Sequence, residues 1–132
     1  MQTLRDAGIT HLLDLREPHE LSAPHFGQGA VDAMENAGIV RLHLPVVDMD
    51  APENADFDAA RRWIEDVLLD PNAKIYLHCR AGMERTAAIA CALEAKRAEI
   101  SFDEALAKLK LKRPIFQPLP AQRTAARAWL GE

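Results

Sequence analysis

Apolar residues are concentrated in three short runs that more polar stretches separate. The runs are Ile9–Leu15, Ile39–Val47 and Lys74–Cys79, and turn-forming residues introduce each of them, Ala-Gly for the first two and Asp-Pro-Asn for the third. Short runs of this kind, bounded by turn signals, are typical of strands buried within a sheet. The pattern therefore predicts three buried strands.

The stretches between and after these runs have the spacing of amphipathic helices. A short helix is expected over Gly29–Ala37, and a longer one from Ala55 to about Leu69 with Asn54 as its N-cap. In the longer helix, apolar residues at helical spacing predict one buried face: Phe57, Ala60, Ile64, Val67 and Leu68. Three more helices are expected after the last strand, from about Arg85 to Ala98, from the capping box at Ser101 to about Lys112, and from near Pro120 to Gly131.

The order of these elements predicts the fold class. Strands separated by helices pair in parallel, so we expect an α/β fold with a central, mostly parallel sheet flanked by helices. No internal repeat and no Pro/Gly/Ser-rich linker divides the sequence, and 132 residues are the usual length of one domain. We therefore treat residues 1–132 as a single domain.

Charge and cysteine content narrow the class of protein. Sixteen basic residues stand against 20 acidic ones, and the net charge of -4 argues against general binding to nucleic acid or to a membrane surface. Two cysteines cannot build a disulfide framework or a four-cysteine zinc cluster. No apolar run reaches the roughly 18 residues of a membrane span, and no leader is recognisable at the N-terminus, so we expect a soluble, cytoplasmic protein.

The charge is unevenly distributed along the chain. Residues 96–132 carry eight basic and four acidic side chains, whereas residues 1–95 carry eight basic and 16 acidic ones. The bases around Lys108–Arg113 are interpreted as a solvated helix face. Cys91 is expected in the core, and the histidines have no metal-ligand spacing, so no metal site is predicted.

The most informative segment is His78-Cys79-Arg80-Ala81-Gly82-Met83-Glu84-Arg85-Thr86, which lies between a predicted strand and a predicted helix. The N–H groups at a helix N-terminus are unpaired and lie at the positive end of the helix dipole, so they bind anions such as phosphate. The same field lowers the pKa of a cysteine placed there, and Arg85 adds a fixed positive charge. Cys79 is therefore a candidate nucleophile.

Other residues of the segment have separate chemical tasks. The planar guanidinium of Arg85 can bind two oxygens of a phosphoryl group. Gly82 allows a tight turn in which successive amides face inward, and the Thr86 hydroxyl can donate to the cysteine sulfur when it leaves. His78 is given only a supporting role, in shaping the loop.

This segment resembles the signature loop of the cysteine-based protein tyrosine and dual-specificity phosphatases. AGITHLLDLRE resembles the early core strand of that superfamily and LPVVDMDAP its general-acid loop, in the same order and spacing. The resemblance implies that Cys79 forms a phosphocysteine and that Thr86 helps to expel the thiolate. It also implies a phosphate cradle without metal or cofactor, formed by Arg80, Ala81, Gly82, Met83, Glu84 and Arg85. The implied substrate is a phosphorylated protein, phosphotyrosine by default, or a small phosphomonoester.

The reaction also needs a general acid, because an alkoxide leaves poorly unless it is protonated. Asp48 is the candidate, since it follows a strand parallel to the one that ends at Cys79, and both should reach the carboxyl edge of the sheet. In the superfamily the acid usually stands three residues after a proline, as Asp48 does after Pro45. Asp50 remains the alternative.

The sequence departs from the superfamily in three respects. Its members usually have two further strands before the segment that resembles Ile9–Leu15, whereas only eight residues precede it here, so the fold is expected to lack those N-terminal strands. Glu84 stands where many relatives have a small residue, and we expect it to point outward. Ala87 stands where the tyrosine-specific relatives commonly have glycine.

Two other functions remain as alternatives. A rhodanese-like sulfurtransferase also holds a cysteine in an anion-binding loop, although its usual loop is shorter and needs no acid. A non-catalytic module that binds phosphate or a phosphopeptide would keep the loop without turnover.

Overall fold

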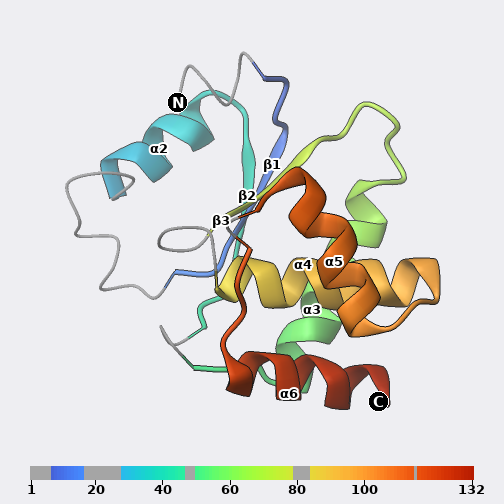
Figure 1. Ribbon diagram of the computed structural model, residues 1–132. Helices are drawn as coiled ribbons and strands as arrows, with labels where there is room; N and C mark the ends of the chain where they lie inside the picture. Colours follow the sequence, from blue (N-terminus) through green and yellow to red (C-terminus); the bar gives the residue numbers. More distant parts are fainter. Residues whose placement is uncertain (1–6, 17–27, 47–49, 79–83, 115) are drawn as a thin grey trace.

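The structure, a computed structural model, describes residues 7–16, 28–46, 50–78, 84–114 and 116–132. Figure 1 shows how strands and helices alternate in the first half of the chain and how three helices follow in the second half. The elements are β1 (His11–Asp14), α2 (Gln28–Asn36), β2 (Val40–His43), α3 (Asn54–Val67), β3 (Ile75–His78), α4 (Arg85–Ala98), α5 (Phe102–Lys112) and α6 (Pro120–Leu130).

The three strands form a parallel sheet in the order β2-β1-β3, which confirms the predicted fold class. In the register of this sheet Leu13 stands opposite Leu42 on one side and Leu77 on the other. Leu13 belongs to the main core, whereas Leu12 packs with Ile39 and Tyr76 in a second, smaller cluster. The central strand is therefore covered on both faces, as the apolar run around it predicts.

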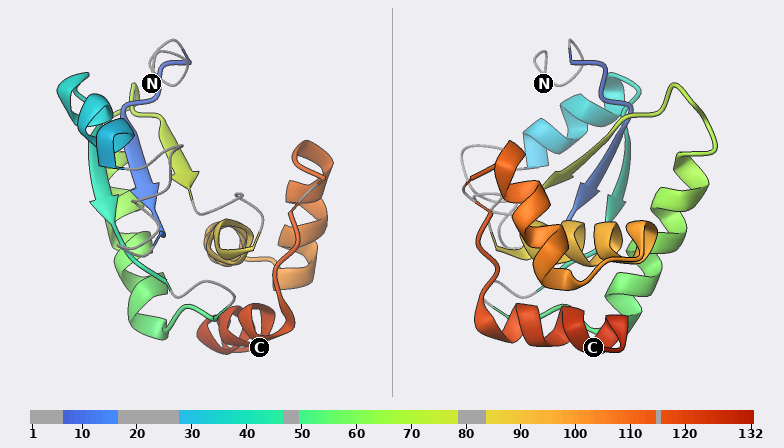
Figure 2. Two further views of the ribbon diagram at one scale, coloured as in Figure 1. Left: turned by 90° about the vertical axis from the view of Figure 1, so that its left-hand side faces the viewer. Right: turned by 45° about the vertical axis from the view of Figure 1, so that its right-hand side comes forward.

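Helix α4 lies at the centre of the molecule. The left view of Figure 2 shows it end-on, with the sheet to its left, α5 to its right and α6 below it. Its buried positions are mostly small, and they include Ala87, Ala88, Ala92 and Ala95, which let neighbouring elements approach closely. Close packing along α4 therefore fixes the position of its first residues.

Helix α3 differs from the prediction at both ends. Its N-cap is Glu53, not Asn54, and the backbone N–H of Glu53 donates to the carboxylate of Asp56 at 2.8 Å. The helix ends at Val67, so Leu68 lies beyond it and is 53% exposed, contrary to the buried position expected for it. Phe57 and Ala60 are buried as predicted.

The helices after the sheet agree closely with the sequence pattern. Helix α4 has the expected bounds, and α5 begins after Ser101, whose Oγ accepts from the Glu104 N–H at 3.1 Å. Helix α6 ends before Gly131, which has a φ of 81°, a conformation that glycine adopts without strain.

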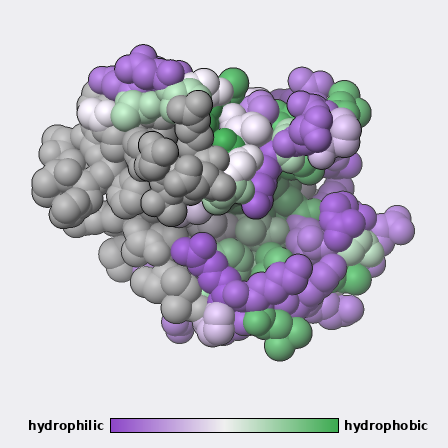
Figure 3. All heavy atoms as spheres, turned by 90° about the horizontal axis from the view of Figure 1, so that it is seen from above, coloured by the Kyte–Doolittle hydropathy of each residue, from purple (hydrophilic) through white to green (hydrophobic). Residues whose placement is uncertain are grey.

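The surface of the described chain is mixed in character. Seen from above, hydrophobic side chains lie in a hollow that hydrophilic ones border (Figure 3). Among the helices built from described residues, none combines the length and the apolar character that crossing a membrane requires.

Candidate active site

The site is built around the carboxyl edge of the sheet. In the register of the sheet, Asp14 at the end of β1 stands opposite His43 of β2 and His78 of β3, so the three strands end side by side. Helix α4 begins at Arg85, and residues 79–83 connect it to β3. The strand, loop and helix therefore follow one another as the sequence predicts, and crevices at this edge of parallel sheets commonly bind ligands.

Arg85 is the described residue that ties these elements together. Its side chain is buried, and Nη1 donates to the carbonyl of Val46 at 2.9 Å and to that of Leu15 at 3.3 Å. Leu15 directly follows β1, and Val46 lies two residues before Asp48. The guanidinium is thus positioned where the first two strands end, next to the chain that leads into the predicted general-acid segment.

Thr86 and Glu84, the two neighbours of Arg85 in the chain, differ in burial. Thr86 is buried in the first turn of α4. Glu84 is the N-cap and is half-buried, but its side chain does not cap the helix.

The remaining predicted site residues lie outside the part of the chain that can be described. These residues are Cys79, Arg80, Ala81, Gly82, Met83 and Asp48, together with the side chain of His78. Their roles therefore stay predictions.

Asp50, the alternative general acid, is exposed at the point where the description of the chain resumes. Its carboxylate accepts from the N–H of Ala51 at 2.8 Å, and its carbonyl accepts from Nε2 of Gln122 at 3.0 Å. Gln122 is completely buried in α6, and its Oε1 accepts from the N–H of Leu119 at 2.9 Å. Gln122 therefore joins the segment after Asp48 to the start of α6.

The sequence analysis missed this role of Gln122. Its signal was available, because Gln122 stands one helical turn before Ala126 on a face that is otherwise apolar. A polar residue at such a position is buried only when its hydrogen bonds are satisfied.

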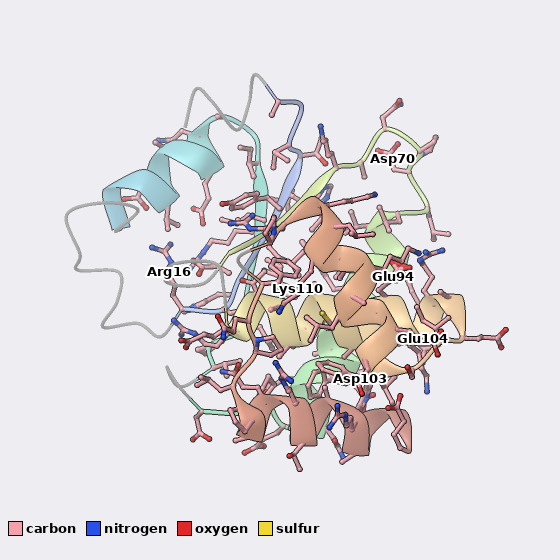
Figure 4. The ribbon with its side chains drawn as sticks, in the orientation of Figure 1. Arg16, Asp70, Glu94, Asp103, Glu104 and Lys110 are labelled. Carbon is pink, nitrogen blue, oxygen red and sulfur yellow. The ribbon has the colours of Figure 1, made fainter. Side chains whose placement is uncertain are left out.

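A buried ion-pair cluster supports the same edge of the sheet. Asp14 is fully buried and binds Arg16 (Nη2 to Oδ2, 2.8 Å) and Arg41 (Nη2 to Oδ2, 3.0 Å). His43 hydrogen-bonds the carbonyl of Arg16. Figure 4 shows Arg16 at the left of the molecule, near the end of the blue strand β1.

The electrostatics of this cluster favour the ionised acid. Burial alone would raise the pKa of the Asp14 carboxyl, but hydrogen bonds and charge from Arg16, with a further bond from Arg41, hold that pKa below its usual value. The cluster was also missed from sequence, although a single acidic residue inside an apolar strand was its signal.

Cys91 has none of the properties of a nucleophile. It is fully buried in α4, as predicted, and burial raises the pKa of its thiol to about 12. Across the described ranges, no three His, Cys, Asp or Glu side chains are grouped as metal ligands.

The fold is similar to that of several solved phosphatases. Kinase associated phosphatase, solved with serine in place of its catalytic-site cysteine, matches with a TM-score of 0.88 and 20% identity over 98% of this chain and 73% of that one. Human tyrosine phosphatase-like serine/threonine/tyrosine-interacting protein matches with a TM-score of 0.81 and 21% identity over 99% of this chain and 82% of that one. At the level of sequence, dual specificity protein phosphatase 26 of Bos taurus is 30% identical over 113 residues, which are 86% of this chain and 51% of that protein.

These likenesses and the edge-of-sheet site define a member of the cysteine-based protein tyrosine phosphatase superfamily, of the dual-specificity kind. A sequence model of the family described as "Polymorphic toxin system, DSP-PTPase phosphatase" matches residues 1–98, and the chain belongs to that family. The chain spans about half the length of the curated relatives that it matches.

Proposed function

We propose that this chain hydrolyses phosphomonoesters through a phosphocysteine intermediate on Cys79, with Asp48 as the general acid. The observation that carries the proposal is the position of Arg85, which is buried at the first residue of α4 and bound to the carbonyls of Leu15 and Val46. This position supports a phosphate site at the start of α4, because the helix N-terminus and the guanidinium both attract an anion there.

In the first step the Cys79 thiolate attacks phosphorus, and the bond from phosphorus to the ester oxygen breaks. Asp48 gives its proton to that oxygen, which leaves as an alcohol. Arg85 binds phosphoryl oxygens as their charge shifts, through its N–H groups.

In the second step water attacks the phosphocysteine. The Asp48 carboxylate takes the proton of that water, the bond from phosphorus to sulfur breaks, and inorganic phosphate leaves. The Thr86 hydroxyl donates a hydrogen bond to the sulfur and so stabilises the departing thiolate. The cycle restores every group without a cofactor.

The substrate that we propose is a phosphorylated protein or a small phosphomonoester. The names of the relatives support phosphoprotein substrates, since they describe a dual specificity protein phosphatase and a kinase associated phosphatase.

The test is hydrolysis of a small aryl phosphate in the presence of a metal chelator, by the natural chain and by Cys79→Ser. Release of phosphate that survives the chelator and is lost in the variant is the expected result. Release that the chelator abolishes, or that Cys79→Ser retains, contradicts the proposed mechanism. Conversion of thiosulfate and cyanide to thiocyanate would instead support the sulfurtransferase alternative.

A second candidate function is phosphate or phosphopeptide binding without turnover. The observation that favours it is the likeness to a protein described as tyrosine phosphatase-like and as interacting. Tight vanadate binding by a natural chain that releases no phosphate would support this candidate over the enzyme.

A further inference from the structure

A groove of about 510 Å³ opens beside the start of α4, and we call it the α6 groove. Its wall joins the residue before Arg85 to the segment ahead of α6 and to one face of that helix: Glu84, Gln117, Leu119, Arg123, Thr124 and Arg127. Glu84 directly follows loop 79–83 in the chain. The α6 groove therefore begins next to the loop to which we assign the phosphate.

The α6 groove contains a cation, Arg123, that forms no ion pair with a described carboxylate. Arg123 is half-buried and donates from Nε to the carbonyl of Pro118 at 3.2 Å, and within the described ranges it forms no ion pair. Arg127, by contrast, is paired with Asp103 of α5. A half-buried charge without a counter-ion favours an anionic ligand, because taking the charge out of water is costly unless it is paired.

A second cation, on α5, also has no ion pair with a described carboxylate. Lys110 of α5 is half-buried, and no ion pair of the described residues includes it, although the sequence predicted a solvated position. Figure 4 shows Lys110 in the middle of the molecule, between α5 and α4. Lys110 and Arg123 each act on the Cys91 thiol of α4, where their positive charges partly offset the effect of burial on its pKa. Both charges therefore act on the same thiol of α4, although Lys110 itself is not among the residues that line the α6 groove.

We propose that the α6 groove binds an acidic side chain of a phosphorylated protein substrate, at a position near the phosphorylated residue. The inference rests on the proposed function, because it assigns the phosphate itself to the loop before Arg85. Arg123 binds the carboxylate and Lys110 adds long-range attraction. Glu84 carries a negative charge on the wall nearest the loop and opposes a second anion there, so the groove selects one acidic residue rather than an acidic run.

The shape of the α6 groove suits a peptide. Pro118, Leu119 and Pro120 form a wall of mostly apolar atoms against which the aliphatic part of a side chain can pack. A carboxylate matches the planar fork of Arg123.

The experiment compares phosphopeptides that are identical except for Glu or Gln at one position near the phosphorylated residue, scanned over the neighbouring positions. We expect one position at which Glu raises kcat/KM about tenfold, the effect of a hydrogen bond between charged groups. Arg123→Gln should abolish the preference and Arg123→Lys should keep part of it. Turnover of a small aryl phosphate should not change in either variant.

The matched control is Arg62→Gln, which removes the charge of an exposed arginine on α3 that has no ion pair with another described residue. It should keep the full preference. Lys110→Gln is the second test variant, because it leaves the hydrogen bond from Arg123 to the carbonyl of Pro118 in place. It should reduce the preference for Glu over Gln about twofold or more. A preference that survives both Arg123→Gln and Lys110→Gln overturns the inference, as does the absence of any preference for Glu.

A binding assay separates this inference from the proposed function. Cys79→Ser cannot form the phosphocysteine, so the difference between its affinities for the Glu and Gln peptides reports on the groove without turnover. If the natural chain hydrolyses nothing while this variant binds the Glu peptide more tightly, the proposed function fails and the groove stands. If aryl phosphate is hydrolysed but neither assay distinguishes the peptides, the groove inference fails and the proposed function stands.

Discussion

Arg85 and Val46 lie 39 residues apart in the sequence, yet Nη1 of the arginine donates to the carbonyl of Val46 at 2.9 Å. This bond fastens the first residue of α4 to the chain that leads into the predicted general-acid segment. The proposed phosphate site and the proposed general-acid segment are therefore linked by one side chain.

Replacing Arg85 by lysine should weaken the site, because an ammonium cannot reproduce a planar, bidentate fork. We expect Arg85→Lys to lower vanadate affinity at least tenfold, as measured by competitive inhibition or calorimetry. Lys96→Arg on the same helix is the control, because it exchanges an ammonium for a guanidinium at a position away from the site. Unchanged vanadate affinity in Arg85→Lys would remove Arg85 from the phosphate site.

The two cysteines should react very differently. Burial raises the pKa of Cys91 to about 12, whereas the helix N-terminus and Arg85 should lower the pKa of Cys79 below the value of about 8.5 for a free thiol. We expect iodoacetate to modify the native protein once, at Cys79, and the unfolded protein twice, as counted by mass spectrometry. Modification of native Cys79→Ser, or a midpoint near 8.5 in the pH profile of inactivation, would contradict this assignment.

Asp48 is expected to serve as acid and then as base. Asp48→Asn should lower kcat for an aryl phosphate about 100-fold or more and remove the limb of the pH profile that reports the protonated acid. Asp50→Asn is the matched control and should keep activity, because it is the same change two residues later. The opposite result would assign the role to Asp50.

Asp14 should matter for stability and not for chemistry. Loss of its charge removes the carboxylate that the buried Arg16 and the half-buried Arg41 share, so Asp14→Asn should lower the free energy of unfolding by about 3 kcal/mol or more at pH 7. Asp66→Asn on the exposed face of α3 should change it by less than about 0.5 kcal/mol. Urea unfolding measures both.

The effect of Asp14 should depend on pH in a defined direction. Its pKa is lowered in the folded protein, so its contribution is fully present above the unfolded pKa of about 3.9 and is lost as the pH falls through the folded pKa. The natural chain and Asp14→Asn should therefore converge in stability in strong acid. A constant difference between pH 7 and the lowest pH at which both fold would contradict the ionised state of Asp14.

Gln122 should stabilise the junction between the segment after Asp48 and α6. Gln122→Leu leaves the N–H of Leu119 and the carbonyl of Asp50 without their partner, which should cost about 1–3 kcal/mol of unfolding free energy. Gln117→Leu, at an exposed position ahead of the same helix, is the control. Equal stability of Gln122→Leu and the natural chain would show that this junction is not held by Gln122.

The periodicity of the sequence predicts most of the fold, because the burial of apolar residues determines both the periodicity and the packing of the elements. Three apolar runs gave the parallel sheet, and Ser101 with Glu104 located the start of α5. The predicted N-cap of α3 was wrong by one residue. Asn54 is the stronger N-cap by residue type, but the helix begins after Glu53, whose backbone N–H donates to the Asp56 carboxylate. Leu68 was expected to be buried because its spacing continues past the residue at which the helix ends.

The candidate site was only partly predictable. The spacing from Cys79 to Arg85 predicts a phosphate loop, because that chemistry requires these residue types within a few positions; of this pair, the structure describes Arg85. Contacts between distant residues were not accessible, since sequence pattern does not report which carbonyl Arg85 binds or that Gln122 reaches Asp50. The excess of basic side chains in residues 96–132 could be read from the sequence, but the half-buried position of Lys110 could not.

The alanine-rich helix at the centre of the molecule also determines how the site can move. Arg85 is the first residue of α4, and the helix is buried between the sheet and helices α5 and α6. The buried interior of this helix is therefore expected to exchange its backbone amides with solvent more slowly than its last turn, where Lys96 and Arg97 are exposed. At the start of α4, where Arg85, Thr86 and Ala87 are buried, amide exchange is expected to require opening of the core.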